Sequence, residues 1–408
     1  MQLNVVIVSN VASVKGGASA VAEASAVGLA ELGVKVYYFA GTGPVSPKLR
    51  DACEEVVCLG RDAYLDRGLK PSTALKGLYD RDARGELERL LGRLDPKNTV
   101  VHFHGWFHSL SPAVFDAVRR CGFASVTTMH EYSLACPNMS LFDYRRKSVC
   151  RIEPMSAGCL LCNCDKRNYP MKVYRYLRTA IYRRCFRLSG TRPIFISEFS
   201  RDVLMGCKGT AGLLGGGFLV KDPVVAEGAE GASCDPEGPY MFIGRVDEEK
   251  GAELFCETAT RMGVRAVVVG DGTRRRALEE AYPSVEFLGW KTGDELARLR
   301  ASARCIVFPS ICYETAGLSV LEAQMAAGTP CIVADGTATS EFVADGVDGL
   351  LFRTGSADAL ACAIELMEDD GTWGRLRRNV GRYGFGEYGL AGHCERLVRV
   401  YEEVLGEM

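Results

Sequence analysis

The sequence FPSICYETAGLSVLEAQMAAGTPC, residues 308–331, decides the fold. The apolar run Cys305 to Phe308 predicts a buried strand, and Pro309 to Thr315 predict a loop. Apolar residues at helical spacing then predict a helix that starts near Gly317 and ends near Gly328, and a second apolar run follows. The stretch therefore predicts a strand, a loop, a helix and another strand, as in a parallel α/β sheet.

Two glutamates border the crevice that such a unit forms. Glu314 lies in the loop, and Glu322 follows slightly over two helical turns later. The free backbone N–H groups at the start of the helix favour an anion, whereas carboxylates accept hydrogen bonds from sugar hydroxyls. A sugar nucleotide, in which a diphosphate joins two polyhydroxylated groups, would satisfy both. Either glutamate alone is more simply interpreted as a solvated surface charge.

The wider sequence pattern favours a sugar-nucleotide ligand over solvated surface charges. The run E-T-A-G-L-S-V-L-E from Glu314 to Glu322, followed by A-x-x-A-x-G-T-P, resembles the E-x7-E signature of retaining glycosyltransferase family 4, which has the GT-B fold. Ala316 stands where the family usually has an aromatic residue, a difference that bears on donor shape. The resemblance implies that Glu314 binds the donor sugar, that Glu322 binds the ribose, and that the amides near Gly317 and Leu318 hold the diphosphate.

Length, charge and hydropathy limit the alternatives. The chain has 408 residues, enough for two domains that each bury a core, and its net charge of −2 argues against a nucleic-acid binder. No apolar run reaches the roughly 18 residues of a membrane span, and residues 2–9 lack the basic flank of a signal peptide. We therefore expect a cytoplasmic protein whose 17 scattered cysteines are mostly reduced.

The resemblance implies an α/β fold of two doubly wound Rossmann-like domains that face each other across a cleft. The first would span 1–215 on the acceptor side, with a Cys-rich basic insertion at 136–187. A linker at 216–239 would lead to the domain that binds the nucleotide sugar, at 240–375, and the C-terminal helices at 376–408 would pack back on the first domain.

Two loops at strand ends carry candidate phosphate contacts. Gly16 and Gly17 precede a helix, and although such a pair more often marks a tight turn, the resembled family has a glycine-rich loop there that faces the donor phosphate. The pattern G-R-x-D-x-x-K-G at 244–251 resembles the diphosphate clamp of the family. Arg245 and Lys250 are therefore predicted to bind the donor, the alternative being surface cations.

Histidines follow two strands of the first domain. His102 and His104 alternate as a metal pair would, but no third ligand has a matching spacing, so we favour a structural role. His130 ends the next strand, where it can hydrogen-bond a sugar hydroxyl or stabilise developing charge, although such histidines are often satisfied within the protein. The resemblance assigns His130 to the cleft, facing the donor sugar.

The insertion is rich in cysteine. Cys159 and Cys162 have zinc-knuckle spacing, and Cys136 and Cys150 could complete a structural zinc site. Because the second C-x-x-C of the common templates is missing, a run of free thiols is the stronger interpretation.

The insertion is also basic. Residues 145–187 contain twelve Lys or Arg against two acidic residues, and apolar residues recur there at helical spacing. The segment 166–188 is therefore predicted to form a basic amphipathic helix. It would contact an anionic membrane at its inner face or a lipid-diphosphate acceptor, or it would be a solvated helix face.

Together these features predict a retaining glycosyltransferase. It would move a sugar from a nucleoside-diphosphate sugar to a hydroxyl of a glycan or lipid-linked acceptor, without a cofactor or catalytic metal. Two alternatives remain: a sugar-nucleotide epimerase on a similar scaffold, and a non-catalytic sensor or scaffold that binds the sugar nucleotide.

Overall fold

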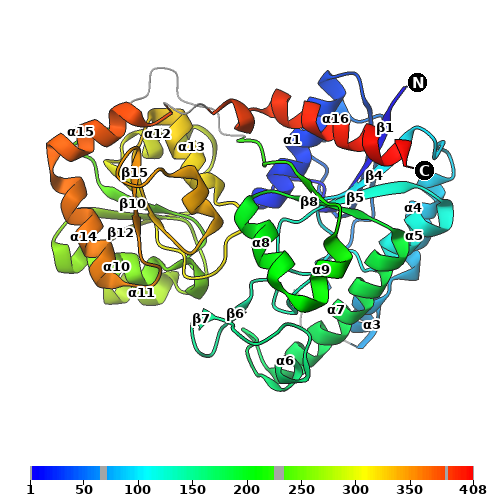
Figure 1. Cartoon of the computed structure of the whole chain (residues 1–408), viewed down its shortest axis with the longest axis horizontal. Coiled ribbons are helices and arrows are strands. Elements are labelled where there is room, and N and C mark those ends of the chain that lie inside the picture. Colours follow the sequence, from blue (N-terminus) through cyan, green and yellow to red (C-terminus); the bar gives the residue numbers. More distant parts are fainter. Residues whose placement is uncertain (1, 65–70, 225–233, 382–384, 408) are drawn as a thin grey trace.

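Two parallel sheets form the centres of two α/β domains (Figure 1). The structure is a computed structural model that describes residues 2–64, 71–224, 234–381 and 385–407. The first sheet has the strand order β3-β2-β1-β4-β5-β8-β9, and the second has the order β12-β11-β10-β13-β14-β15. In both sheets the order in which strands are added reverses beside the first strand, β1 or β10, as in doubly wound domains. The predicted fold class is confirmed.

The first domain buries its sheet between two layers of helices. Its strands are β1 (Asn4–Val11), β2 (Lys35–Thr42), β3 (Glu55–Cys58), β4 (Thr99–Phe103), β5 (Ala124–Thr128), β8 (Arg192–Phe195) and β9 (Phe218–Leu219). Its helices are α1 (Gly17–Glu31), α2 (Pro47–Ala52), α3 (Pro71–Leu78), α4 (Arg81–Leu91), α5 (Ala113–Cys121), α6 (Ala157–Leu161), α7 (Tyr169–Ser189), α8 (Glu198–Gly206) and α9 (Lys208–Leu214). Alternate residues of β1 serve the two faces: Val6 and Val8 pack with α4 and α5, while Val5 and Ile7 pack with α1.

The second domain repeats this layering. Its strands are β10 (Tyr240–Ile243), β11 (Ala266–Val269), β12 (Glu286–Gly289), β13 (Cys305–Phe308), β14 (Cys331–Ala334) and β15 (Gly349–Phe352). Its helices are α10 (Ala252–Met262), α11 (Arg275–Ala281), α12 (Gly293–Ala301), α13 (Leu318–Ala327), α14 (Ala357–Glu368) and α15 (Asp370–Asn379), with 3-10 turns η1 (Glu248–Lys250) and η2 (Ala338–Phe342). Phe255 of α10 and Ile364 of α14 cover one face of the sheet, and Val320 and Ala323 of α13 cover the other.

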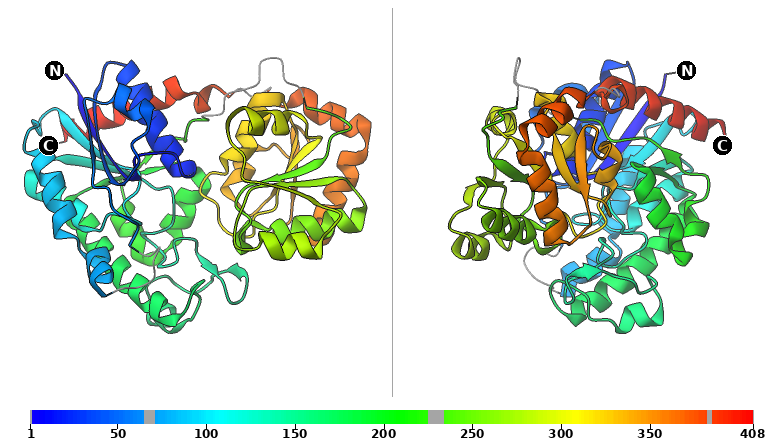
Figure 2. Two further views of the ribbon diagram at one scale, coloured as in Figure 1. Left: turned by 180° about the vertical axis from the view of Figure 1, so that it is seen from behind. Right: turned by 60° about the vertical axis from the view of Figure 1, so that its left-hand side comes forward.

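The chain crosses between the domains twice. Part of the predicted linker, residues 225–233, lies outside the described residues, and residues 218–219 form the edge strand β9. After η3 (Gly386–Tyr388), helix α16 (Leu390–Gly406) returns to the first domain and packs on α1 (Figures 1 and 2). Leu397 and Tyr401 of α16 complete the core on the α1 face of the first sheet.

Helix α7 differs from the predicted basic amphipathic helix because several of its cations point inward. Arg178 is fully buried, where its guanidinium donates to the carbonyls of Gly77 (2.8 Å) and Leu110 (3.1 Å), and burial lowers its pKa to about 10. Arg183 likewise donates to the carbonyl of Leu134 at 2.7 Å. These cations pair with backbone carbonyls of the first domain, so only part of the charge predicted for the outer face lies there.

None of the helices in the described ranges is long and apolar enough to cross a membrane.

Candidate active site at the domain interface

The site begins at the N-terminus of α13. Gly317 has φ 91°, and a Cβ there would lie 2.0 Å from Thr339 Oγ1, so only glycine fits. Thr339 in turn donates to the carbonyl of Ala316 at 3.1 Å, which fixes the entry of the chain into the helix. The N–H groups of the first two residues of α13, Leu318 and Ser319, precede the first helical hydrogen bond and carry the positive end of the helix dipole, whereas Val320 N–H donates to the carbonyl of Gly317 at 3.2 Å. This geometry suits an anion, as predicted.

Glu314 and Lys250 form a partly buried ion pair beside that helix terminus. Lys250 Nζ lies 2.6 and 2.8 Å from the two carboxylate oxygens, and Ser310 also donates to Glu314. Burial alone would raise the pKa of Glu314, but the Lys250 ammonium and these hydrogen bonds outweigh it, and the pKa is lowered. Burial would lower the pKa of Lys250, but Glu314 outweighs it and the pKa is raised. The pair joins the loops that follow β10 and β13.

Arg245 occupies the same loop as Lys250 but is open to solvent. Its guanidinium lies 2.7 Å from Asp247 Oδ2 and 3.4 Å from Glu249 Oε1, and 58% of the side chain is exposed. The side chain is therefore accessible to a ligand at the edge of the second domain.

Glu322 lies on α13, as predicted, and forms an ion pair with Arg300 of α12. Arg300 is nearly buried, and burial lowers the pKa of its guanidinium, which Glu322 partly offsets. The side chain of Glu322 keeps 21% of its surface exposed, so the carboxylate remains accessible at the edge of the helix.

The loop that carries Glu314 also contacts the first domain. Thr315 Oγ1 donates to the carbonyl of His130 (2.8 Å), and the hydroxyl of Tyr132 donates to the carbonyl of Glu314 (3.0 Å). Ser197, at the end of β8, donates to the carbonyl of Thr315 at 2.7 Å. These bonds bring two predicted residues, Glu314 and His130, to one interface between the domains.

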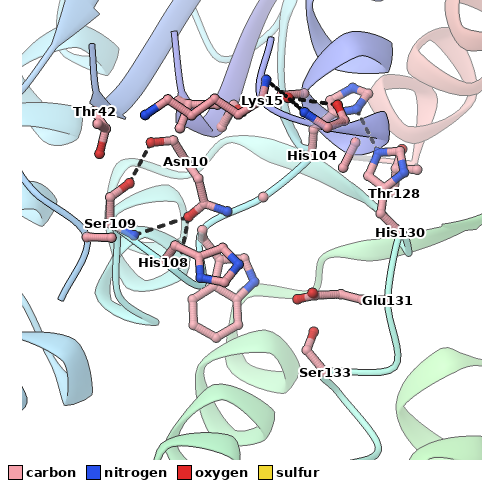
Figure 3. A pocket seen from close by; sticks show the side chains of 18 of the residues that line it. Asn10, Lys15, Thr42, His104, His108, Ser109, Thr128, His130, Glu131 and Ser133 are labelled. Atoms are coloured by element: carbon pink, nitrogen blue, oxygen red, sulfur yellow. Dashed lines mark hydrogen bonds between the residues drawn. The ribbon is translucent and has the colours of Figure 1, made fainter. Parts of the chain in front are cut away.

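A cavity of about 480 Å³ opens in the first domain at the carboxyl ends of β1, β2, β4 and β5 (Figure 3). Gly16 and Gly17 line it, as do His104, His130 and Glu131. A Cβ at either glycine would meet nothing within 4 Å, so both face open space rather than a packed turn. The remaining lining residues named in the figure are Asn10, Lys15, Thr42, His108, Ser109, Thr128 and Ser133.

His130 is held between two partners that the sequence did not reveal. Its Nδ1 lies 3.3 Å from Asp222 Oδ2, and its Nε2 lies 3.1 Å from Nδ1 of His104. Nε2 of His104 is buried and has no hydrogen-bond partner among the described residues, and burial holds the pKa of His104 well below its ordinary value. His104 was expected only to have a structural role, and Asp222, in the segment after β9, gave no local signal.

Glu131 is a further residue of this cavity that the sequence did not single out. Burial raises the pKa of its carboxyl, and Ser133 and His130 offset part of the rise. A carboxyl group in this position can accept or donate a hydrogen bond within the cavity. Its only signal in the sequence is its position next to His130.

His102 has the structural role that we favoured. Its two ring nitrogens lie 2.7 Å from Tyr401 of α16 and 2.7 Å from Thr128 of β5, and the ring is fully buried. Its hydrogen bonds tie the last helix to the first sheet.

The cysteines of the insertion surround a buried lysine. Lys172 of α7 lies 3.3 Å from the sulfur of Cys159 and 3.2 Å from that of Cys164, and Asn138 donates to Cys164 at 3.3 Å. Burial alone would lower the pKa of Lys172, but the surrounding thiols raise it.

No group of three or more His, Cys, Asp or Glu side chains within the described residues is arranged to hold a metal ion. The zinc site at Cys136, Cys150, Cys159 and Cys162 therefore stays a prediction without a preformed geometry.

The fold and this interface define a class of protein, the two-domain GT-B proteins. A solved Anabaena protein, in complex with UDP and glucose, aligns over 98% of this chain and 100% of its own with a TM-score of 0.66 at 13% identity. Sucrose-phosphate synthase from Thermosynechococcus elongatus aligns over 100% of both chains with a TM-score of 0.69 at 17% identity. At these identities the likeness shows the fold alone.

A known family model matches the sequence of the second domain. Residues 239–370, which carry Arg245, Lys250, Glu314 and Glu322, match the family model described as Glycosyl transferases group 1. This match confirms the predicted resemblance for that part of the chain.

Curated relatives agree over part of their length. A GDP-mannose-dependent alpha-mannosyltransferase of Corynebacterium glutamicum is 34% identical over 142 residues, 34% of either chain. An uncharacterized glycosyltransferase of Methanocaldococcus jannaschii is 29% identical over 181 residues, 41% of this chain and 45% of the relative. The matched region of this chain thus spans less than half the length of either relative.

Proposed function

We propose that the protein is a retaining glycosyltransferase that moves a sugar from a nucleoside-diphosphate sugar to an acceptor hydroxyl. The observation that carries this proposal is the partly buried pair of Glu314 and Lys250 near the N-terminus of α13. Thr315, the next residue, donates to the carbonyl of His130 in the first domain. This arrangement places an acid, a cation and free backbone amides together, as a sugar diphosphate requires.

The donor would lie along the loops after β10 and β13. Lys250, Arg245 and the first amides of α13 would hold the diphosphate and neutralise the charge that grows on it as the bond to the sugar breaks. Glu314 would accept hydrogen bonds from the sugar hydroxyls, and Glu322 would bind the ribose. With the anomeric carbon fixed in this way, the acceptor attacks the face from which the phosphate leaves, and the phosphate takes the acceptor proton.

The acceptor would occupy the cavity of the first domain. Its polar lining from several strand ends suits the hydroxyls of a sugar unit, and His130 lies between this cavity and the loop of Glu314. Closure of the two domains would exclude water and limit hydrolysis of the donor. Such an acceptor would place the protein in polysaccharide or lipid-linked glycan assembly.

Contact with an anionic membrane is part of this proposal for the outer face of α7. Leu177 and Leu188 are 52% and 50% exposed, and Arg184 and Arg187 lie exposed on the same stretch of the helix. Apolar and basic side chains on one face suit the surface of an anionic bilayer, which would bring a lipid-linked acceptor close to the cavity.

The test is release of nucleotide from UDP-, GDP-, ADP- and dTDP-sugars by the protein and by Glu314→Gln, without added metal. Glu365→Gln, an exposed residue of α14, is the matched control. We expect slow release from one donor that is lost only in Glu314→Gln.

Two other outcomes would favour the alternatives. An isomerised donor would support an epimerase. Binding without turnover, even with membrane lipid extract present, would support a non-catalytic sensor.

A further inference from the structure

The insertion of the first domain reaches the loop that follows β10 in the second domain. We call this loop, residues 244–251, the donor loop. Strands β6 (Phe142–Asp143) and β7 (Ser148–Val149) form a hairpin that extends toward the second domain (Figure 2). Lys147, in its turn, lies 2.6 Å from Glu248 and 4.0 Å from Glu253. Lys166, just before α7, lies 3.2 Å from Asp247. The acids belong to the loop and helix that follow β10, next to Arg245 and Lys250.

The donor loop is acidic next to the residues that would hold the diphosphate. Asp247, Glu248 and Glu249 are consecutive, and two of them are nearly buried, with 6% and 4% of Asp247 and Glu249 exposed. Arg245 contacts both of these buried acids. Unless other cations compensate the acids, they repel a diphosphate and keep Arg245 turned toward themselves.

The compensating cations come from two sources. Arg274, within the second domain, lies 3.3 Å from Glu248 and 2.9 Å from Glu253. The insertion supplies the others, since Lys166 shares Asp247 with Arg245, and Lys147 shares Glu248 with Arg274. Each lysine therefore neutralises part of the charge of an acid that an arginine also contacts.

The insertion is built to hold these lysines in place. Lys147 has φ 52°, a left-handed conformation that costs a lysine more than a glycine. Asp143 accepts from the backbone N–H of Arg145 at 2.9 Å and stabilises the hairpin turn. At the base of the insertion, Lys172 and the thiols of Cys159 and Cys164 tie it to α7.

We propose that Lys147 and Lys166 are positioning residues for the donor. From across the domain interface, Lys166 neutralises Asp247, which Arg245 also contacts, and Lys147 neutralises Glu248. The diphosphate of the nucleotide sugar would therefore meet less negative charge beside Arg245. The insertion thereby makes donor binding depend on contact between the two domains. The identity of the ligand in this inference rests on the proposed function. The contacts of Lys147 and Lys166 with the donor loop do not depend on it.

The test compares three variants by calorimetric titration with UDP, GDP, ADP and dTDP and by hydrogen exchange of residues 245–251. Lys147→Glu reverses the charge at the contact, and Lys147→Glu/Glu248→Lys restores an opposite pair. Arg146→Glu is the matched control, because Arg146 lies in the same turn, is 77% exposed and pairs at 3.9 Å only with Asp143 of its own hairpin in the described structure.

We expect Lys147→Glu to weaken binding of the preferred nucleotide by about 5-fold at low salt and to speed exchange in the donor loop, because like charges then meet at Glu248. The double variant should recover most of both, and Arg146→Glu should change neither. Equal effects of Lys147→Glu and Arg146→Glu, or no recovery in the double variant, would overturn the proposal. A wild-type protein that binds none of the four nucleotides would count against the proposed function, and hydrogen exchange would still decide whether Lys147 holds the loop.

Discussion

Replacement of Gly317 by alanine should damage the donor site more than its single methyl group suggests. At φ 91° an alanine carries backbone strain of about 1 kcal/mol. Its Cβ would also lie 2.0 Å from Thr339 Oγ1 and 2.9 Å from the Cβ and Cγ2 of the same side chain. Such an overlap in a packed region costs about 1–3 kcal/mol more. We therefore expect Gly317→Ala to destabilise the second domain by about 3 kcal/mol.

The same helix offers a matched control. Gly328 ends α13 at φ 64°, but a Cβ there would meet nothing within 4 Å, so Gly328→Ala should cost only the backbone strain of about 1 kcal/mol. Urea unfolding of both variants isolates the overlap with Thr339, and calorimetric titration with the preferred nucleotide measures its effect on the first amides of α13. Equal stability of Gly317→Ala and Gly328→Ala would refute the account of this turn.

Three further predictions concern the site. The pKa of Glu314 is lowered in the folded protein, so the stability it contributes is present above its ordinary pKa and is lost as the pH falls through the folded value. Lys250→Met removes the cation that lowers the pKa of Glu314, so burial should raise that pKa and the acid limb of the pH–rate profile should move to higher pH. An unmoved limb would contradict the role of the Lys250–Glu314 ion pair. Asp222→Asn removes the charged partner of His130 and should lower kcat about 10-fold while nucleotide affinity stays within 2-fold; equal losses of both would mean a merely structural role. Turnover should persist after dialysis against EDTA, and loss that added Mg²⁺ restores would contradict a metal-independent mechanism.

The donor side of the site could be predicted because its determinants are local. The run from Cys305 to Ala334 contains a strand, a helix bounded by two glycines and a second strand, and the structure has β13, α13 and β14 at these residues. The carboxyl ends of parallel strands meet at one edge of the sheet, so the loops of Lys250 and Glu314 had to lie close together. The ion pair between them follows from that arrangement.

The rest of the site depends on contacts between distant segments. Asp222 reaches His130 from the segment that leaves the first sheet, and Lys147 reaches Glu248 from the insertion, and neither contact leaves a pattern in the local sequence. Helix α7 shows the same limit in another form. Its spacing predicted an amphipathic helix, but a cation such as Arg178 can be buried once backbone carbonyls accept its hydrogen bonds, which only the folded chain reveals.

The central claim is that this interface transfers a sugar with retained configuration. The measurement that tests it most directly is proton NMR of the first product formed from the preferred α-linked donor, with Glu314→Gln as the inactive comparison. The account predicts an α-configured product that appears before any β form and is absent with the variant. A β-configured first product, or a product formed equally well without Glu314, would contradict it.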